Sequence, residues 1–95
     1  MTQRRKISII TPTHNRRESL GRLLEAVAKQ DFPMEDIEVI VVCDGCHDDT
    51  VSFLKAYSPA FQLKYIEQPG LGASNARNQG AALATGEQLI FLDDD

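Results

Sequence analysis

Short apolar segments rich in β-branched residues alternate with segments of helical period along the chain. Four apolar segments predict β-strands, at residues 6–11, 37–43, 62–67 and 88–92. Three segments between them predict α-helices, at residues 16–30, about 49–57 and roughly 74–85. This alternation is typical of an α/β layer in which about three helices cover a mainly parallel, four-stranded sheet. The continuous apolar run VIVV in the second strand fits a central strand with helices on both faces.

Polar residues at the helix ends predict how the helices start and stop. Asn15 precedes the first helix with Glu18 three residues later, which is the spacing of a capping box. Asp48 is the predicted cap of the second helix, and Gly86 is the predicted stop of the third. Each of these four residues therefore has a predicted structural role.

Every predicted strand is followed by a polar or glycine-rich segment. In chain order these segments read TPTHNRR, CDGCHDD, QPGLGASNARNQG and DDD. In parallel α/β sheets, ligands bind beyond the carboxyl ends of the strands, where such segments meet. We therefore expect one binding site at this edge of the sheet.

Three consecutive carboxylates, Asp93, Asp94 and Asp95, follow the last strand. Like charges at this spacing repel one another, and a divalent cation with oxygen ligands is the usual means of holding them together. On an extended chain Asp93 and Asp95 point to one side, whereas Asp94 points away or toward a neighbouring group. Because Mg²⁺ and Mn²⁺ commonly bind together with substrate phosphates, the pattern predicts a phosphate-bearing substrate.

Asp44 lies just beyond the second strand, ahead of a glycine-containing turn into a helix. An acid at this place in an α/β fold accepts hydrogen bonds from a nucleoside, and the alternative is a simple turn or cap residue. Pro12, Thr13 and Asn15 follow the first strand in a rigid turn whose backbone is predicted to contact a base or a sugar. We therefore expect a nucleoside to bind near these two segments.

The segment GLGASNARNQG resembles the dinucleotide fingerprint G-x-G-x-x-G but does not match it. Asn75 takes the place of the third glycine, and the segment follows the third strand rather than the first. We interpret it as a flexible turn that brings Asn75, Arg77 and Asn78 near the ligand crevice. Arg77 either approaches a diphosphate or forms a surface salt bridge. Arg16 and Arg17 have a similar pair of alternatives, a phosphate contact or a solvated helix start.

Composition and charge limit the class of protein. The 95 residues are 42% apolar and 25% charged, which fits one small globular domain. A net charge of −4 argues against a nucleic-acid-binding surface. Two cysteines without an export signal predict a cytoplasmic protein that lacks a structural disulfide. Three acids directly after a strand predict that residues 1–95 are the N-terminal part of a longer protein.

Residues 43–47, with the sequence CDGCH, match the Cys-x-x-Cys-His pattern of haem attachment and the Cys-x-x-Cys pattern of zinc or redox sites. Haem attachment normally accompanies export, for which the N-terminus has no suitable apolar segment. A tetrahedral zinc site needs further ligands, yet His14 is the only other histidine and a third cysteine is absent. A dithiol pair stays open as an alternative, because thioredoxin-like motifs also follow a strand.

Taken in order, the four strand-end motifs resemble glycosyltransferase family 2, a large family of inverting nucleotide-sugar transferases of the GT-A type. The matching segments are ISIITPTHNR, EVIVVCDGCHDDT and GLGASNARNQGAALATGEQLIFLDDD. The likeness covers the whole chain, with the motifs in the family's order and spacing. It implies a Rossmann-like GT-A fold, of which residues 1–95 form the N-terminal nucleotide-sugar-binding part ending at a D-x-D element.

The resemblance implies a role for each matching position. Asp44 matches the residue that binds the nucleobase, usually uracil, and the turn at residues 12–15 matches a wall of the same pocket. Asp93 and Asp95 match the D-x-D element, whose acids hold a ribose or, chiefly through the last Asp, the metal that bridges the diphosphate. The residues predicted to bind the nucleotide sugar are Pro12, Thr13, Asn15, Asp44, Arg77, Asp93 and Asp94, and the predicted ligands of Mg²⁺ or Mn²⁺ are Asp93 and Asp95.

The reaction that the resemblance implies moves a sugar from a nucleotide-diphosphate donor, usually a UDP-sugar, to an acceptor hydroxyl with inversion. The metal stabilises the leaving diphosphate, and a carboxylate takes the proton of the acceptor. In the family that base lies well downstream of the D-x-D element, so residues 1–95 alone are expected to bind a donor without turnover. Acceptors are glycans, lipids or other hydroxyl compounds, and membrane association of the longer protein stays open.

Two other classes of function are weighed against this one. A nucleotidyltransferase shares a similar α/β layer and metal-binding acids, but it would need a Gly- and Arg-rich loop after the first strand, where TPTHNRR has no glycine. The other alternative is a truncated, non-catalytic module that kept the nucleotide-binding fold. Cys43, Cys46 and His47 stand where Asp, Ser and Thr are common in the family, which bears on donor preference more than on the class of reaction.

Overall fold

The computed structural model describes residues 6–94. Within this range the chain forms four strands and three α-helices, as predicted, and one short 3-10 helix, η1. In chain order the elements are β1 (Ile7–Thr13), α1 (Arg17–Ala28), η1 (Met34–Asp36), β2 (Ile37–Asp44), α2 (Thr50–Ala56), β3 (Gln62–Gln68), α3 (Ala73–Leu83) and β4 (Gln88–Phe91). The first strand runs two residues beyond its predicted end. Pro12 and Thr13, predicted as a turn, therefore belong to β1, because its pairing with β2 continues to Thr13 and Cys43.

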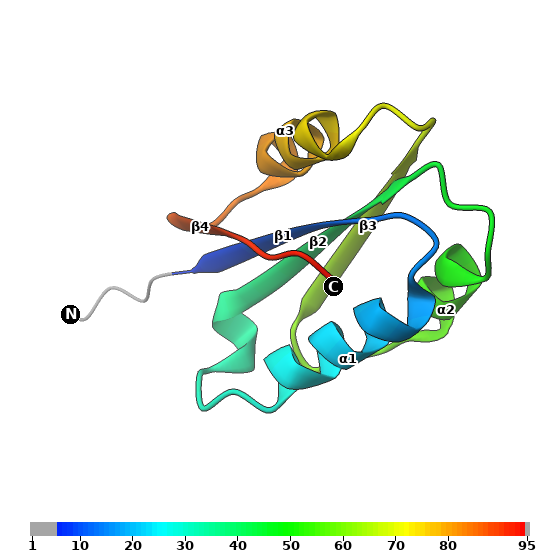
Figure 1. Ribbon diagram of the computed structural model, residues 1–95. Coiled ribbons are helices and arrows are strands. Elements are labelled where there is room, and N and C mark those ends of the chain that lie inside the picture. Colours follow the sequence, from blue (N-terminus) through cyan, green and yellow to red (C-terminus); the bar gives the residue numbers. More distant parts are fainter. Residues whose placement is uncertain (1–5, 95) are drawn as a thin grey trace.

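The four strands form one parallel sheet in the order β3-β2-β1-β4 (Figure 1). Strand β1 lies between β2 and β4, with Ile7 opposite Ile37 on one side and Gln88 on the other. Helix α3 covers one face of the sheet, and α1 and α2 cover the other (Figure 1). The predicted α/β class is confirmed, and the carboxyl ends of the strands meet at one edge.

The face toward α1 and α2 carries the larger apolar core. Leu20 and Leu24 of α1 are fully buried, and Val27 is nearly so, as their helical spacing predicts. They pack with alternate residues of the strands and with the second helix; the buried members of this cluster are Ile9, Leu20, Leu24, Val27, Ile37, Val39, Val41, Cys43, Leu54 and Phe61. Alternation of side chains along each strand leaves the residues between them for the opposite face.

The face toward α3 is packed through small residues. Ile10, Ile40 and Val42 form its buried cluster with Ala76 of α3. Gly80 lies one helical turn further along, and a Cβ added there would come within 2.5 Å of Ile10 Cγ2. The helix can approach the sheet closely only because these positions are Ala and Gly.

Two of the predicted helix-end roles are wrong. Asn15 does not cap α1, because its backbone has a positive φ of 51° and its Oδ1 accepts hydrogen bonds from the amides of His47 and Asp48 instead, at 2.6 and 3.1 Å. Asn15 therefore joins the segments after β1 and β2. Gly86 does not end α3, which stops at Leu83.

Gly86 is needed for close packing against β1, and Asp48 contributes a hydrogen bond to the start of α2. A Cβ at Gly86 would lie 2.6 Å from Ser8 Oγ and 2.8 Å from Lys6 O, so only glycine fits between α3 and β1. Asp49 is the residue directly before α2, yet Asp48 Oδ1 accepts the hydrogen bond from Thr50 N at 3.1 Å. The N-cap position of α2 therefore belongs to Asp49 rather than to the predicted Asp48, although Asp48 still accepts an amide hydrogen bond from the first turn.

A fully buried carboxylate, Glu38, lies at the amino end of the sheet on the α3 face. Its Oε2 accepts hydrogen bonds from Ser8 Oγ at 2.5 Å and from the amide and hydroxyl of Thr85 at 2.7 and 3.0 Å. Lys64 Nζ lies 2.7 Å from its Oε1. Burial alone would raise the pKa of Glu38, but the contacts with Lys64, Ser8 and Thr85 lower it to about 2.

This Glu38 network fixes the connection between α3 and β4. Thr85 is held by Glu38, and the amide of the next residue, Gly86, donates to Ser8 Oγ at 2.8 Å. The amide of Glu87 then donates to Lys6 O at 2.9 Å, directly before β4 begins. The start of β4 is therefore anchored to β1 and β2 at the end of the sheet opposite the predicted site.

Strand β4 is an edge strand of the described sheet, and all four of its side chains are exposed. Leu89, Ile90 and Phe91 are 39–47% exposed. Within the described sheet, the outer edge of β4 is therefore open to solvent. Between residues 6 and 94, the helices are too short or too polar to cross a membrane.

Candidate functional site

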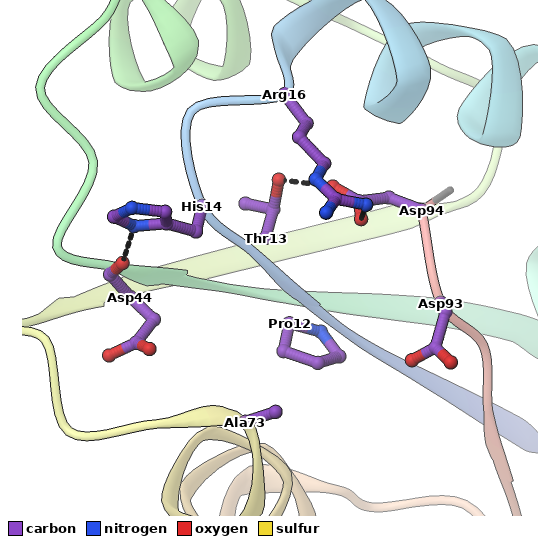
Figure 2. Close-up of a pocket in the computed structure, with 8 residues that line it drawn as sticks. All are labelled: Pro12, Thr13, His14, Arg16, Asp44, Ala73, Asp93 and Asp94. Atoms are coloured by element: carbon purple, nitrogen blue, oxygen red, sulfur yellow. Dashed lines mark hydrogen bonds and ion pairs between the residues drawn. The ribbon is translucent and has the colours of Figure 1, made fainter.

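A pocket of about 280 Å³ opens at the carboxyl ends of β1, β2 and β4, beside the start of α3 (Figure 2). It is lined by Pro12, Thr13, His14, Arg16, Asp44, Ala73, Asp93 and Asp94. Five of these eight residues belong to the predicted binding set. All four strand-end segments thus contribute to one pocket, as expected, and the third contributes Ala73 at the start of α3.

Asp44 is held by the segment that follows β3. Its Oδ1 accepts hydrogen bonds from Gln68 Nε2 at 2.9 Å and from Leu71 N at 2.8 Å, and its Oδ2 accepts one from Gly72 N at 3.0 Å. The bond from Gln68, followed by those from Leu71 and Gly72, lowers the pKa of Asp44, so the group is ionised at neutral pH. Since a carboxylate has about four acceptor positions, one position on Oδ2 stays available to a ligand.

His14 lies over the main chain of Asp44 and lines the same pocket (Figure 2). Its Nδ1 is 2.6 Å from the carbonyl oxygen of Asp44. A carbonyl oxygen can only accept, so Nδ1 carries the hydrogen, and Nε2 of the neutral ring is an acceptor. From the sequence, His14 was considered only as a zinc ligand. Its place between Thr13 and Asn15, in a predicted binding segment, is the signal that could have identified it as a pocket residue.

Asp94 joins the end of β4 to the end of β1. Its side chain is only 7% exposed, and its Oδ2 accepts a hydrogen bond from Thr13 Oγ1 at 2.5 Å. Arg16 Nη1 lies 3.9 Å from its Oδ1, and Figure 2 shows the guanidinium beside the Asp94 carboxylate. Asp94 thus points toward a neighbouring group, as one of the two predicted orientations had it. Arg16 lines the pocket, and its predicted phosphate contact stays a prediction.

Asp93 has the opposite orientation and remains at the surface of the pocket. Its side chain is 64% exposed and lies 3.3 Å from the guanidinium of Arg77. Arg77 does not line the pocket and forms the surface salt bridge that was one of its two predicted alternatives. Asp95, the other predicted metal ligand, lies outside the described residues. Within the described part of the chain, no three His, Cys, Asp or Glu side chains are grouped as metal ligands.

The remaining predicted residues lie around the pocket rather than in it. Asn15 bridges two loops through its side chain, as described above, and does not line the pocket. Asn75, one residue before the buried Ala76, does not line the pocket either. Cys43 is buried and Cys46 is partly buried, and both are free thiols. Of the residues predicted to bind the nucleotide sugar, five line this pocket, namely Pro12, Thr13, Asp44, Asp93 and Asp94, and their roles stay predictions.

Residues 8–95 match the family model "Glycosyl transferase family 2". The chain belongs to this family. It is 40% identical over 89 residues, 92% of the chain, to the validoxylamine A glucosyltransferase of Streptomyces hygroscopicus subsp. jinggangensis, of which it spans 21%. Membership of glycosyl transferase family 2 confirms the resemblance read from the strand-end motifs, and it weighs against the nucleotidyltransferase alternative.

Solved structures of glycosyl transferases have the same fold. Residues 1–349 of Staphylococcus aureus TarS, in complex with UDP-GlcNAc, superpose with a TM-score of 0.87 at 36% identity, over 95% of this chain and 26% of that TarS fragment. The mannosyltransferase PcManGT of Pyrobaculum calidifontis, in complex with GDP-Man and Mn²⁺, superposes with a TM-score of 0.90 at 30% identity, over 99% of this chain and 28% of the enzyme. The predicted Rossmann-like GT-A fold is confirmed, and the chain spans about a quarter of each of these two structures.

Proposed function

We propose that the pocket at the carboxyl ends of β1, β2 and β4 binds the donor of a glycosyl transfer reaction, a nucleoside diphosphate sugar. The observation that carries the proposal is the meeting of Asp44, from the end of β2, with Asp93 and Asp94, which follow β4, on one pocket. Relatives with this fold bind UDP-GlcNAc or GDP-Man, which supports the same class of donor here.

The nucleobase is assigned to Asp44. One acceptor position remains on its Oδ2, and an ionised carboxylate makes a stronger hydrogen bond to an N–H donor than a neutral acceptor does. Uracil and guanine each present a ring N–H that such a position can accept, whereas the ring nitrogens on the pairing edge of adenine and cytosine carry no hydrogen. We propose uracil, and therefore a UDP-sugar. The UDP-GlcNAc complex of TarS supports this choice, because TarS has a higher sequence identity to this chain than PcManGT has.

The charges at the pocket fit a divalent cation beside the diphosphate. Asp44, Asp93 and Asp94 contribute three negative charges, and Arg16 is the one arginine or lysine among the eight lining residues. A diphosphate would add further negative charge, which a cation must offset. Mg²⁺ or Mn²⁺ keeps few protein ligands, so exposed Asp93 together with Asp95 would suffice to hold it. When bound, the ion stabilises charge on the leaving diphosphate.

The chain's own residues orient the donor in this proposal. Asp44 accepts the N–H of the base, while the hydrogen bond from Thr13 to Asp94 keeps the ends of β1 and β4 together. Arg16 lies where its guanidinium can reach a phosphate from the pocket side. The sugar is then transferred to an acceptor hydroxyl, of a glycan, a lipid or another hydroxyl compound, with inversion. None of residues 6–94 is assigned as the base that takes the acceptor's proton.

Thermal unfolding of the full-length protein with nucleotides tests the proposal. UDP with Mn²⁺ should raise the melting temperature, because a ligand at one hundred times its Kd stabilises the native state by about 2.7 kcal/mol. ADP and CDP should stabilise much less. Asp44→Asn should lose most of the UDP effect, and Asp93→Asn should lose the contribution of Mn²⁺. Asp31→Asn, an exposed acid in the loop after α1, is the matched control and should behave like the wild type.

Two results would count against the proposal. Equal stabilisation by UDP, ADP and CDP would show that Asp44 does not select the base. Stabilisation by UDP that neither Mn²⁺ nor Asp93→Asn alters would remove the assigned role of the acids after β4. Transfer itself is measured separately, as release of UDP from a UDP-sugar in the presence of an acceptor.

A further inference from the structure

Two thiols flank Asp44 on the side of its turn that faces away from the donor pocket. Cys43 is the penultimate residue of β2, and its side chain belongs to the core toward α1 and α2. The chain then turns at Gly45, which has a positive φ of 67°, and Cys46 packs against the same core. Cys43 and Cys46 therefore lie on either side of the turn, pack in the same core cluster and line one pocket.

Cys46 also connects this turn to the end of β1. Its thiol donates to the carbonyl oxygen of Thr13 at a distance of 3.6 Å. Thr13 in turn donates its hydroxyl to Asp94, so one residue of β1 links the thiol to an acid of the donor pocket. A change at the Cys46 sulfur therefore acts on both pocket-lining segments, the one after β1 and the one after β2.

The thiols can be reached from a second, separate pocket of about 300 Å³. It is lined by Cys43, Gly45, Cys46, His47, Glu67, Gln68 and Pro69. None of these residues lines the donor pocket, which lies on the other side of Asp44. Cys43 is 1% exposed, whereas Cys46 is partly exposed, so a reagent in this second pocket meets Cys46 first.

We propose that Cys43 and Cys46 form a reversible dithiol–disulfide pair, and that closing the disulfide weakens binding of the nucleotide sugar at Asp44. The effect on binding rests on the proposed function, whereas formation of the disulfide does not. The ligand class of this site is a low-molecular-weight disulfide such as oxidised glutathione. Dithiols that cycle in this way are the usual form of disulfides in a reducing compartment.

The chemistry is a pair of thiol–disulfide exchanges. The Cys46 thiolate attacks one sulfur of oxidised glutathione, forming a mixed disulfide and releasing one glutathione thiolate, which takes up the proton that Cys46 lost. The Cys43 thiol then loses its proton and attacks the Cys46 sulfur, which forms the Cys43–Cys46 bond and releases the second glutathione as a thiol. Two protein thiols are oxidised, and one glutathione disulfide is reduced to two thiols.

The environment of the two sulfurs supports this order of attack. Burial, followed by the charge of the neighbouring Cys46 thiolate and its hydrogen bond, raises the pKa of Cys43 to about 12, with smaller contributions from Glu67 and Asp48. Cys43 is therefore a poor first nucleophile. Once Cys46 is a neutral mixed disulfide, its charge no longer opposes ionisation of Cys43, and the second exchange becomes easier.

Closing the disulfide must move the Asp44 turn. A disulfide holds its two sulfurs at a bond length of about 2.0 Å, and Asp44 and Gly45 lie inside the ring that this bond closes. The Cys46 thiol hydrogen is lost, which leaves the Thr13 carbonyl without this donor. The Asp44 carboxylate is then displaced from the amides of Leu71 and Gly72. In the reduced protein these amides donate hydrogen bonds to it at 2.8 and 3.0 Å.

The first experiment asks whether the disulfide forms. The full-length protein is incubated with oxidised glutathione, and the free thiols are then alkylated. After digestion, mass spectrometry gives the mass of the peptide that contains both cysteines. We expect the wild type to lose two hydrogen atoms within that peptide and to recover them with a reductant. Cys43→Ala should stop at the glutathione adduct on Cys46, and Cys46→Ser should show neither product. Two free thiols, or a bond between two chains, in the oxidised wild type overturn the proposal.

The second experiment measures binding of UDP with Mn²⁺ to the reduced and oxidised protein. A disulfide that misaligns one charge-assisted hydrogen bond should weaken UDP binding about tenfold. Cys46→Ser keeps a hydroxyl donor for the Thr13 carbonyl, so it should bind UDP equally under both conditions. A disulfide that forms and leaves the Kd for UDP within about twofold also overturns the proposal.

Failure of the proposed function can be distinguished from failure of the disulfide proposal. If the reduced wild type does not bind UDP, the assignment of the donor pocket is wrong. Exchange of the Leu71 and Gly72 amide hydrogens then reports on the Asp44 turn without any nucleotide, because Asp44 accepts from both. Faster exchange of these two amides in the oxidised protein supports the coupling, and unchanged exchange overturns it.

Discussion

The two ends of the sheet carry acids in contrasting environments. At the amino end, Glu38 is fully buried, and every polar contact described for it comes from the protein's own side chains and backbone. At the carboxyl end, Asp44 keeps one acceptor position toward the pocket, and Asp93 is 64% exposed. Both Glu38 and Asp44 have lowered pKa values, yet Asp44 lines a pocket that a ligand can enter, whereas Glu38 is fully buried among the protein's own groups.

This difference separates stability from function in a parallel α/β layer. A buried carboxylate whose partners all belong to the protein holds elements together, and removing it leaves those partners unpaired. A carboxylate that is only partly used by its own chain is available to a ligand. The Glu38 network fixes where β4 begins, and the acids that β4 delivers to the pocket are placed by that anchor.

The largest expected effect is on stability and belongs to Glu38→Ala. The substitution leaves the Lys64 ammonium and the Thr85 groups without their buried partner, so the free energy of unfolding should fall by about 3–5 kcal/mol. Urea unfolding followed by circular dichroism measures it. Glu67→Ala removes an exposed acid of β3 and is the matched control, expected within about 0.5 kcal/mol of the wild type. Equal effects of the two substitutions would contradict the contrast between buried and exposed acids.

Acid should remove the same stabilisation. The pKa of Glu38 is lowered from 4.5 to about 2 in the folded protein. A group with a depressed folded-state pKa stabilises the protein above its unfolded pKa, and this stability is lost as the pH falls through the folded value. We expect a loss of about 3 kcal/mol between pH 5 and pH 2 from this group.

Glu38→Gln isolates that contribution from the other acids. Asp44 and Asp48 also have lowered pKa values. Both groups are present in the wild type and in Glu38→Gln, so their contributions cancel in the comparison. The difference in unfolding free energy between the wild type and Glu38→Gln should therefore shrink as the pH falls from 5 toward 2. A difference that stays constant over this range would show that folding does not lower the pKa of Glu38.

The pattern of apolar residues predicted the fold well because the strands are short and continuously buried. The run from Ile37 to Cys43 could be read as a central strand from its side chains alone. Asn15 and Gly86 could not be read in this way. Asn15 has its partners 32 and 33 residues away, and Gly86 is required by contact with β1, 78 residues before it. Local capping rules do not contain these distant contacts.

The site was predictable to the extent that strand ends converge. Asp44, Asp93 and Asp94 were identified from their places after strands, which topology alone brings together. Glu38 was not singled out, although a single acid inside an apolar central strand is a signal of a buried ion pair. Its partner Lys64 lies on a different strand, so the pair becomes visible only when β2 and β3 are placed side by side.

The smallest expected effect on stability belongs to the ion pair between Arg77 and Asp93, which is exposed on both sides, at 38% and 64%. Arg77→Gln should change the free energy of unfolding by less than about 1 kcal/mol, and raised salt should abolish even that difference.

The same substitution removes a positive charge 3.3 Å from a carboxylate assigned to the metal, so stabilisation by Mn²⁺ with UDP should be kept or increased. Thermal unfolding with and without Mn²⁺ measures both quantities. A large loss of stability would place Asp93 in the same class as Glu38, and a loss of the Mn²⁺ effect would make Arg77 part of the donor site. Either result would break the contrast between an amino end that stabilises the sheet and a carboxyl end whose acids remain available to a ligand.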